Sequence, residues 1–209
     1  MFDAVDFQQV KIIAWDFDGV LCRNIVDGRL IWADDFENDI GHSKDVFIEY
    51  IFGNDFNAIL TGREDLGDRI DCWAKAVGCQ ISSDDLMDYW FKKDALPDAI
   101  TLAAMEHFTQ QGLRQIITTN NEHHRASYIE NEMGFGEKVD FIFASGRMGV
   151  AKPDAEYFEK VTESLSAKST EFLLIDDCAK NISAAKGFGW QAVHFTSEVR
   201  AALGAVIIV

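Results

Sequence analysis

The stretch Val10-Lys11-Ile12-Ile13-Ala14-Trp15-Asp16-Phe17-Asp18-Gly19-Val20-Leu21 carries the clearest structural signal in the chain. Its apolar first half is typical of a buried parallel strand. Asp16 and Asp18 follow two positions apart, so both side chains project to one side if the backbone stays extended. In open α/β sheets, ligands bind beyond the carboxyl ends of the strands. Because crowded carboxylates repel each other, the pattern indicates a site for a hard cation such as Mg²⁺. An ordinary Asp-x-Asp-Gly turn is the alternative.

Three later segments have the same design. A β-rich run ends in Thr118-Thr119-Asn120-Asn121, and a second apolar run ends in Asp176-Asp177. Between them, a loop presents Lys152 directly before Pro153, and we expect Pro153 to start a helix. Such residues supply the nucleophile, acid/base, hydrogen-bond donors, cation and metal ligands that phosphoryl transfer requires.

In this order, the four segments resemble the four motifs of the haloacid dehalogenase superfamily, on its phosphatase side. The resemblance covers residues from about 10 to 194, apart from the segment between the first two motifs. It implies that Asp16 is the nucleophile and Asp18 the general acid/base. The dehalogenases of that superfamily attack carbon and lack an aspartate at the position of Asp18. The resemblance therefore favours a metal-dependent phosphohydrolase.

The resemblance also implies which residues bind the phosphoryl group and the metal. The residues that it assigns to the phosphoryl group are Thr119, Asn120 and Lys152. It implies a Mg²⁺ cofactor bound by Asp16, the backbone carbonyl of Asp18 and Asp177. Asp176 is either a further ligand or a partner of the ligands.

Strand and helix patterns alternate through most of the chain. After the opening strand, strands are expected at 115–119, 139–144, 172–175 and 191–195, and helices at 98–111, 122–133, 153–165 and 179–186. Such alternation predicts an α/β fold with a doubly wound parallel sheet, Rossmann-like, covered by helices on both faces. We expect residues 1–22 and 96–209 to form this catalytic core. The apolar tail Ala205–Val209 is interpreted either as an edge strand or as a surface for a subunit contact.

Residues 23–95 interrupt the alternation. They contain no long β-branched run but show helical spacings of apolar residues, so we expect an all-helical insertion. Its position resembles that of the superfamily's small helical cap, which closes over the catalytic carboxylates and selects the substrate. Trp73, Trp90 and Phe91 are interpreted as the core of this cap. Arg63 is a candidate substrate ligand because its guanidinium grips anions, with an ion pair to Glu64 or Asp65 as the alternative.

The composition of the chain limits the kinds of partner that it is expected to bind. The formal net charge is −16 and no basic run is present, which argues against nucleic acid as a partner. No apolar run approaches the roughly 20 residues that span a bilayer. The four cysteines form no Cys-x-x-Cys pair and the opening residues show no signal-peptide pattern, so we expect reduced thiols and a cytoplasmic location. His123 and His124 are interpreted as solvent-facing helix residues, and no zinc site is expected.

The sequence therefore predicts a Mg²⁺-dependent phosphatase that hydrolyses a small phosphorylated metabolite through an aspartyl-phosphate. A sugar phosphate is the expected example. The alternatives are a phosphomutase on the same core and, from a different class, a non-catalytic phosphate-binding or phospho-receiver module. The oligomeric state, monomer or dimer, stays open.

Overall fold

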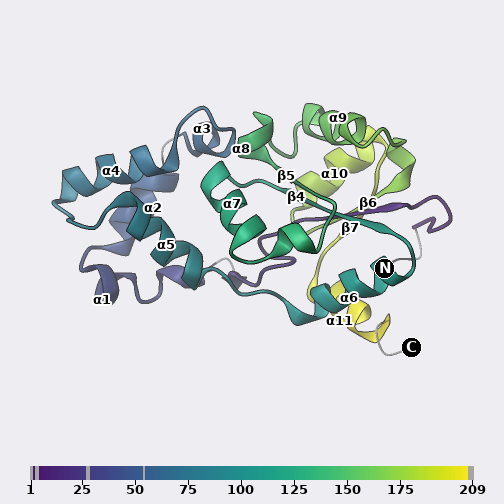
Figure 1. The fold of residues 1–209 in the computed structure, drawn as a ribbon, viewed down its shortest axis with the longest axis horizontal. Helices are drawn as coiled ribbons and strands as arrows, with labels where there is room; N and C mark the ends of the chain where they lie inside the picture. The colour runs from purple at the N-terminus through teal and green to yellow at the C-terminus, as the bar shows by residue number, and fades with distance from the viewer. Residues whose placement is uncertain (1, 3–4, 27–28, 54, 207–209) are drawn as a thin grey trace.

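A computed structural model of the chain describes residues 2, 5–26, 29–53 and 55–206. Five parallel strands form the central sheet, in the order β5-β4-β1-β6-β7 (Figure 1). Their bounds are β1 Ile12–Trp15, β4 Arg114–Thr119, β5 Phe141–Ala144, β6 Phe172–Asp176 and β7 Gln191–His194. β1 is central, and its Trp15 is in register with Ile117 of β4 and Ile175 of β6. The carboxyl ends of these three strands therefore lie side by side.

Successive side chains of β1 point to opposite faces of the sheet, and an apolar layer lies on each face. Ile13 and Trp15 pack with one group of helices, whereas Ile12 and Ala14 pack with another. The first group is α6 (Ala99–Gln110), α7 (His123–Asn131) and α11 (Ser197–Val206), and the second is α9 (Ala155–Ser164) and α10 (Ala179–Phe188). Figure 1 shows α6 and α11 below the sheet and α9 and α10 above it. The predicted doubly wound parallel sheet is confirmed.

Several element boundaries differ from those expected. Pro153 does not start a helix, because the Asp154 carboxylate caps α9 by accepting a hydrogen bond from the Glu156 N–H at 3.0 Å. β5 starts two residues later than expected, because a 3₁₀ turn, η2 (Phe135–Glu137), precedes it and the Val139 N–H donates to that turn. The tail is helical through Val206, so its first two residues form no edge strand. Residues 207–209 lie outside the described part of the chain.

The insertion has an apolar core of its own. It contains α1 (Phe36–Ile40), α2 (Lys44–Phe52), α3 (Phe56–Leu60), α4 (Leu66–Val77), α5 (Ser83–Lys93) and the 3₁₀ turn η1 (Ile31–Ala33). Trp73, Trp90 and Phe91 are buried within it, as expected. A short hairpin that the sequence analysis does not predict, β2 (Ile25–Val26) with β3 (Arg29–Leu30), precedes the helices. Two-residue strands are too short to show a period.

The insertion leaves and rejoins the core at one place. The Arg23 N–H donates to the Leu96 carbonyl, and the Asp98 N–H donates to the Leu21 carbonyl, each at 2.8 Å. A second approach lies at Gly62, where an added Cβ would come within 2.5 Å of the Gly146 carbonyl oxygen. Gly62 also has a φ of +69°, which favours glycine. The insertion is therefore held beside the carboxyl ends of the strands.

The described part of the chain contains no helix that combines the length and apolar character needed to span a bilayer. All four cysteines lie in the described part of the chain, and each carries a free thiol.

Candidate active site

Lys152 is the centre of a buried ionic cluster at the strand ends. Its ammonium group donates to Asp16 Oδ1 at 3.0 Å, to Asp176 Oδ2 at 2.6 Å and to the Thr118 carbonyl at 2.6 Å. Its side chain is only 1% exposed. Burial by itself lowers the pKa of Lys152, but the two carboxylates outweigh it and raise the pKa above its usual value. Lys152 is therefore a permanent cation with all three of its protons engaged.

Asp16 lies directly after β1 and is buried. Its Oδ1 accepts from the Lys152 ammonium and from the Phe17 N–H, the latter at 2.8 Å. Burial raises the pKa of Asp16 well above its usual range, Lys152 opposes that shift, and Asp176 and Asp177 add to it. A further positive charge beside Asp16 would restore its ionised form.

The two aspartates at the end of β6, Asp176 within the strand and Asp177 directly after it, differ in their surroundings. Asp176 is fully buried, and both of its oxygens accept hydrogen bonds, from Lys152, the Asn181 amide and the Cys178 N–H. Asp177 is exposed, and its carboxylate faces Gly19, where an added Cβ would lie 2.3 Å from Oδ2. Oxygen atoms of Asp16, Asp176 and Asp177 lie within 4.8 Å of one another. This all-oxygen, anionic set fits a Mg²⁺ ion.

Asp18 lies apart from the buried cluster and is partly exposed. Its Oδ1 accepts from the Asn24 amide at 2.6 Å, and its Oδ2 accepts from the Asn121 amide at 2.7 Å. The Asn121 amide also donates to Thr119 Oγ1 at 2.7 Å. Asn121 thus connects two residues that the motifs name. The sequence analysis gives Asn121 no role, although its place at the end of β4 was a usable signal.

A buried ion pair connects the core to the returning linker. The Arg125 guanidinium lies 3.3 Å from Asp94 Oδ2 and 3.7 Å from Asp18 Oδ1. The Asn24 amide donates to the same Asp94 oxygen at 3.0 Å. Burial raises the pKa of Asp94 to about 6, although Arg125 opposes that shift. The sequence analysis does not single out Arg125, Asp94 or Asn24, because nothing in their local pattern indicates that they meet.

The Asn120 side chain contacts the backbone of Lys152. Its Nδ2 donates to the Lys152 carbonyl at 2.7 Å, and its Oδ1 accepts from the Lys152 N–H at 2.9 Å. Both amide atoms therefore hold the lysine loop against the end of β4. The Asn120 side chain therefore positions Lys152, and its contact with a phosphoryl group stays a prediction.

Arg63 contacts Asp55 and Thr61 of the insertion, and its role as a substrate ligand stays a prediction. Its side chain is 60% exposed, lies 3.6 Å from Asp55 Oδ2 and donates to Thr61 Oγ1 at 3.1 Å. Neither Glu64 nor Asp65 is its partner among the described ion pairs. Arg63 lines a groove against the Lys152 loop and does not line the cavity beside Asp18.

A cavity of about 260 Å³ opens between the insertion and the strand ends. Asp18, Asn121 and Arg125 form part of its polar end. Its apolar walls come from the insertion and are Ile25, Leu30, Trp32, Phe52, Phe56, Leu60, Leu66, Trp90 and Phe91. Trp90 and Phe91 therefore have two roles, as cap core and as cavity wall. Apolar lining with a few convergent polar groups is typical of a small-molecule site.

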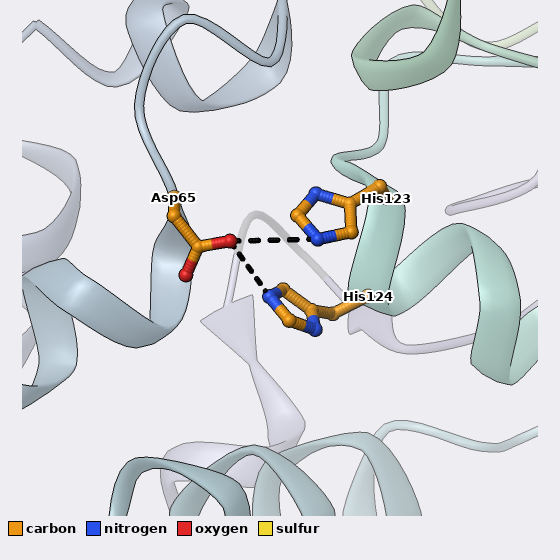
Figure 2. A group of neighbouring side chains, drawn as sticks. All are labelled: Asp65, His123 and His124. Atoms are coloured by element: carbon orange, nitrogen blue, oxygen red, sulfur yellow. Dashed lines mark hydrogen bonds and ion pairs between the residues drawn. The ribbon is translucent and has the colours of Figure 1, made fainter.

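His123 and His124 are not simply solvent-facing. Both rings turn toward Asp65 of the insertion (Figure 2), with His124 Nε2 3.0 Å and His123 Nε2 3.4 Å from Asp65 Oδ2. The sequence analysis missed this group because Asp65 is distant in the chain from the two histidines.

A family model described as haloacid dehalogenase-like hydrolase matches residues 10–189. The chain is 28% identical over 106 residues to the sesquiterpene phosphatase astK of Aspergillus oryzae, covering 49% of this chain and 53% of that protein. It is 29% identical over 107 residues to phosphatase MT3486 of Mycobacterium tuberculosis, covering 51% and 48%. The chain thus spans about half the length of these curated relatives.

Solved structures show the same fold at low identity. The HAD family enzyme bt-2542 of Bacteroides thetaiotaomicron, in complex with magnesium and inorganic phosphate, superposes with a TM-score of 0.72 at 19% identity, covering 90% of this chain and 95% of that one. The L-2-haloacid dehalogenase of Xanthobacter autotrophicus superposes with a TM-score of 0.65 at 17% identity, covering 92% and 81%. The two neighbours share this fold although their names describe different enzymes.

Proposed function

Because the chain belongs to the haloacid dehalogenase-like hydrolases, we propose that it is a Mg²⁺-dependent phosphatase acting through an aspartyl-phosphate on Asp16. The observation that carries the proposal is the arrangement around Asp16. A buried lysine holds one of its oxygens, and two further carboxylates lie within 4.8 Å. Asp18 lies just beyond, at the polar end of a cavity. This arrangement provides a nucleophile, a charge clamp and a separate acid/base.

Within the described residues, both hydrogen bonds to the Asp16 side chain end on Oδ1. We assign Oδ2 as the attacking atom, because it is then the freer oxygen. It forms a bond to phosphorus while the bond from phosphorus to the alcohol oxygen breaks, and Asp18 donates a proton to the departing alcohol. Asp18 next takes a proton from water, which attacks phosphorus and releases inorganic phosphate from Asp16.

Positive charge must balance this cluster throughout. Lys152 neutralises Asp16 and the transferring group, and the Thr119 hydroxyl is assigned to donate to a phosphoryl oxygen. The proposed Mg²⁺ ligands are Asp16, the Asp18 backbone carbonyl and Asp177. When bound, the ion would supply the positive charge that draws the phosphoryl oxygens toward Asp16. Asp176 is assigned to positioning Lys152, because both of its oxygens already accept hydrogen bonds.

The cavity walls argue for an apolar alcohol on the substrate. A sugar has many hydroxyl groups, and burying them against aromatic side chains without hydrogen-bond partners is costly. An isoprenoid chain has no such groups and gains from the same burial. The likeness to a protein named a sesquiterpene phosphatase supports this choice. We therefore prefer an isoprenoid monophosphate over the sugar phosphate expected from the sequence.

The test is phosphate release by the purified chain with Mg²⁺, using farnesyl monophosphate and hexose phosphates. We expect a kcat/KM at least about tenfold higher for the farnesyl ester, the scale of a few buried methylenes. Asp16→Asn should abolish phosphate release. The matched control is Asp140→Asn, which should leave release unchanged, because Asp140 lies on the surface of the α/β domain.

Each part of the proposal has its own contrary result. Substantial release in EDTA would overturn the metal dependence, and release by Asp16→Asn would overturn the nucleophile. A higher kcat/KM for a hexose phosphate would overturn the substrate class. Conversion of hexose 1-phosphate to hexose 6-phosphate without free phosphate would identify a phosphomutase.

A further inference from the structure

A second group of ionisable side chains lies where the insertion meets the core (Figure 2). Asp65 precedes α4 of the insertion, and His123 and His124 begin α7 of the core. Asp65 Oδ2 lies 3.0 Å from His124 Nε2 and 3.4 Å from His123 Nε2. One ligand atom from each residue lies within 4.8 Å of the others. The group therefore joins two parts of the molecule through three potential ligand atoms.

Helix caps hold both sides of this group in place. The other Asp65 oxygen, Oδ1, accepts from the Asp68 N–H at 3.1 Å, so Oδ2 is left facing the histidines. Opposite it, the Glu122 carboxylate accepts from the N–H groups of His124 and Arg125, each at 2.6 Å. The two imidazole rings lie 3.9 Å apart at 35° to each other. Their Nε2 atoms thus turn to the same side, as Figure 2 shows.

The spacing suits a tetrahedral metal ion. Zn²⁺ binds histidine nitrogen and carboxylate oxygen at about 2.0–2.2 Å, so neighbouring ligand atoms in a tetrahedron lie about 3.3–3.5 Å apart. The two distances to Asp65 Oδ2, 3.0 and 3.4 Å, are close to that edge. Two imidazoles and one carboxylate suit Zn²⁺ and its neighbours in the first transition row better than Mg²⁺, which prefers oxygen alone.

We propose that Asp65, His123 and His124 bind a divalent transition-metal ion, with Zn²⁺ as the reference, which cross-links the insertion to the core. The side chains are 32–47% exposed, so an ion has access from solvent and a water completes the coordination. Two neighbours of this group line the apolar cavity: Leu66, which follows Asp65, and Glu122, which precedes His123. A bound ion therefore fixes the position of two cavity-lining residues relative to each other.

The experiment measures metal binding, which does not depend on the proposed reaction. The 209-residue chain, in excess Mg²⁺, is titrated with Zn²⁺ by calorimetry and with Co²⁺ by visible absorption. We expect one ion per chain and a Co²⁺ spectrum of tetrahedral nitrogen and oxygen ligands. Zn²⁺ at about 100 times its Kd should raise the Tm by roughly 5–10 °C.

Three variants and two controls locate the ion. We expect Zn²⁺ binding to weaken by at least about 10–100-fold in each of Asp65→Asn, His123→Gln and His124→Gln. That is the loss seen when a residue that only hydrogen-bonds a metal ligand is replaced. Asparagine at position 65 can still cap α4, so the helix is retained. His107→Gln, on α6, should bind as the wild type does. Asp177→Asn should retain the Zn²⁺ site, which separates it from the Mg²⁺ cluster.

Two results overturn the proposal. One is the absence of Zn²⁺ binding in excess Mg²⁺, which would leave a hydrogen-bonded contact only. The other is binding that survives His124→Gln but is lost in Asp177→Asn, which would place the ion at the strand ends.

Discussion

The core and the insertion face the same cavity with opposite chemistry. The core contributes the polar end of the cavity, with Asp18 and Arg125, and beside it a buried set of charges around Lys152. The insertion contributes aromatic and aliphatic walls. Buried charges are strongly interdependent, because removing one leaves its partners uncompensated. Apolar walls act mainly through shape and area, so single changes there are milder. The comparison predicts severe losses of rate from core changes and graded losses of selectivity from insertion changes.

After Asp16→Asn, the largest effect is expected for Asp18→Asn with an alkyl phosphate. The leaving alkoxide needs a proton, so the rate should fall by about 10²–10⁴. With a nitrophenyl ester, whose leaving group is a stable anion, the first step should survive and the aspartyl-phosphate should accumulate. Rapid-quench measurement should show a burst of up to one equivalent of nitrophenol. Equal losses with both esters and no burst would assign Asp18 a structural role.

Lys152→Ala should lower kcat by about 10²–10³, the loss expected for one preorganised charge contact. The matched control is Lys160→Ala, because Lys160 is exposed and pairs with Glu156 on the surface. Steady-state kinetics with a saturating ester measures both variants. A change below about threefold in Lys152→Ala would mean that another cation fulfils its role.

Gly19→Ala tests the close approach of the Asp177 carboxylate to the loop that follows β1. Gly19 and Gly112 have nearly the same φ, +82° and +81°, so alanine costs each about 1–2 kcal/mol of stability. Of these two glycines, Gly19 is the one where the added Cβ would meet a carboxylate, 2.3 Å from Asp177 Oδ2, whereas nothing lies within 4 Å at Gly112. The Mg²⁺ concentration for half-maximal activity should therefore rise about tenfold in Gly19→Ala. An equal rise in Gly112→Ala would attribute the effect to strain alone.

The smallest effect concerns the apolar wall. Ile25 is 39% exposed and lines the cavity, so Ile25→Asn should raise KM for an isoprenoid phosphate by about 3–10-fold with little loss of folding stability. Val46→Asn is the control, since Val46 is 50% exposed on the insertion and lies outside the cavity lining. A short aryl phosphate should show no difference between the variants. A rise in KM for both esters would contradict an apolar subsite.

The core was predictable because its signals are local. A buried strand leaves a continuous apolar run, and the residue after its end is placed by the sheet itself, as with Asp16 and Asp177. Helix ends were less predictable, because the helix expected to start at Pro153 starts at Ala155, after the Asp154 carboxylate that caps it.

The remaining parts of the site depend on contacts between distant segments. Asn24, Asp94 and Arg125 meet only once the insertion has folded back on the core, and Asp65 reaches the histidines in the same way. Their local sequences are ordinary helix ends and linkers. The partners of Asn120 and Arg63 could not be predicted for the same reason, since contacts between distant segments decide where such flexible polar side chains point.

The paired linkers at Arg23 and Leu96 make the insertion a separable module. Its two ends are joined by a hydrogen bond, so a short turn could replace the helices without changing the order of the strands in the sheet. The entropy lost in closing such a short turn would be small. A different insertion could be joined at the same two residues. The reaction and the choice of substrate can therefore change independently in evolution, one through point substitutions at strand ends and the other through replacement of a whole segment.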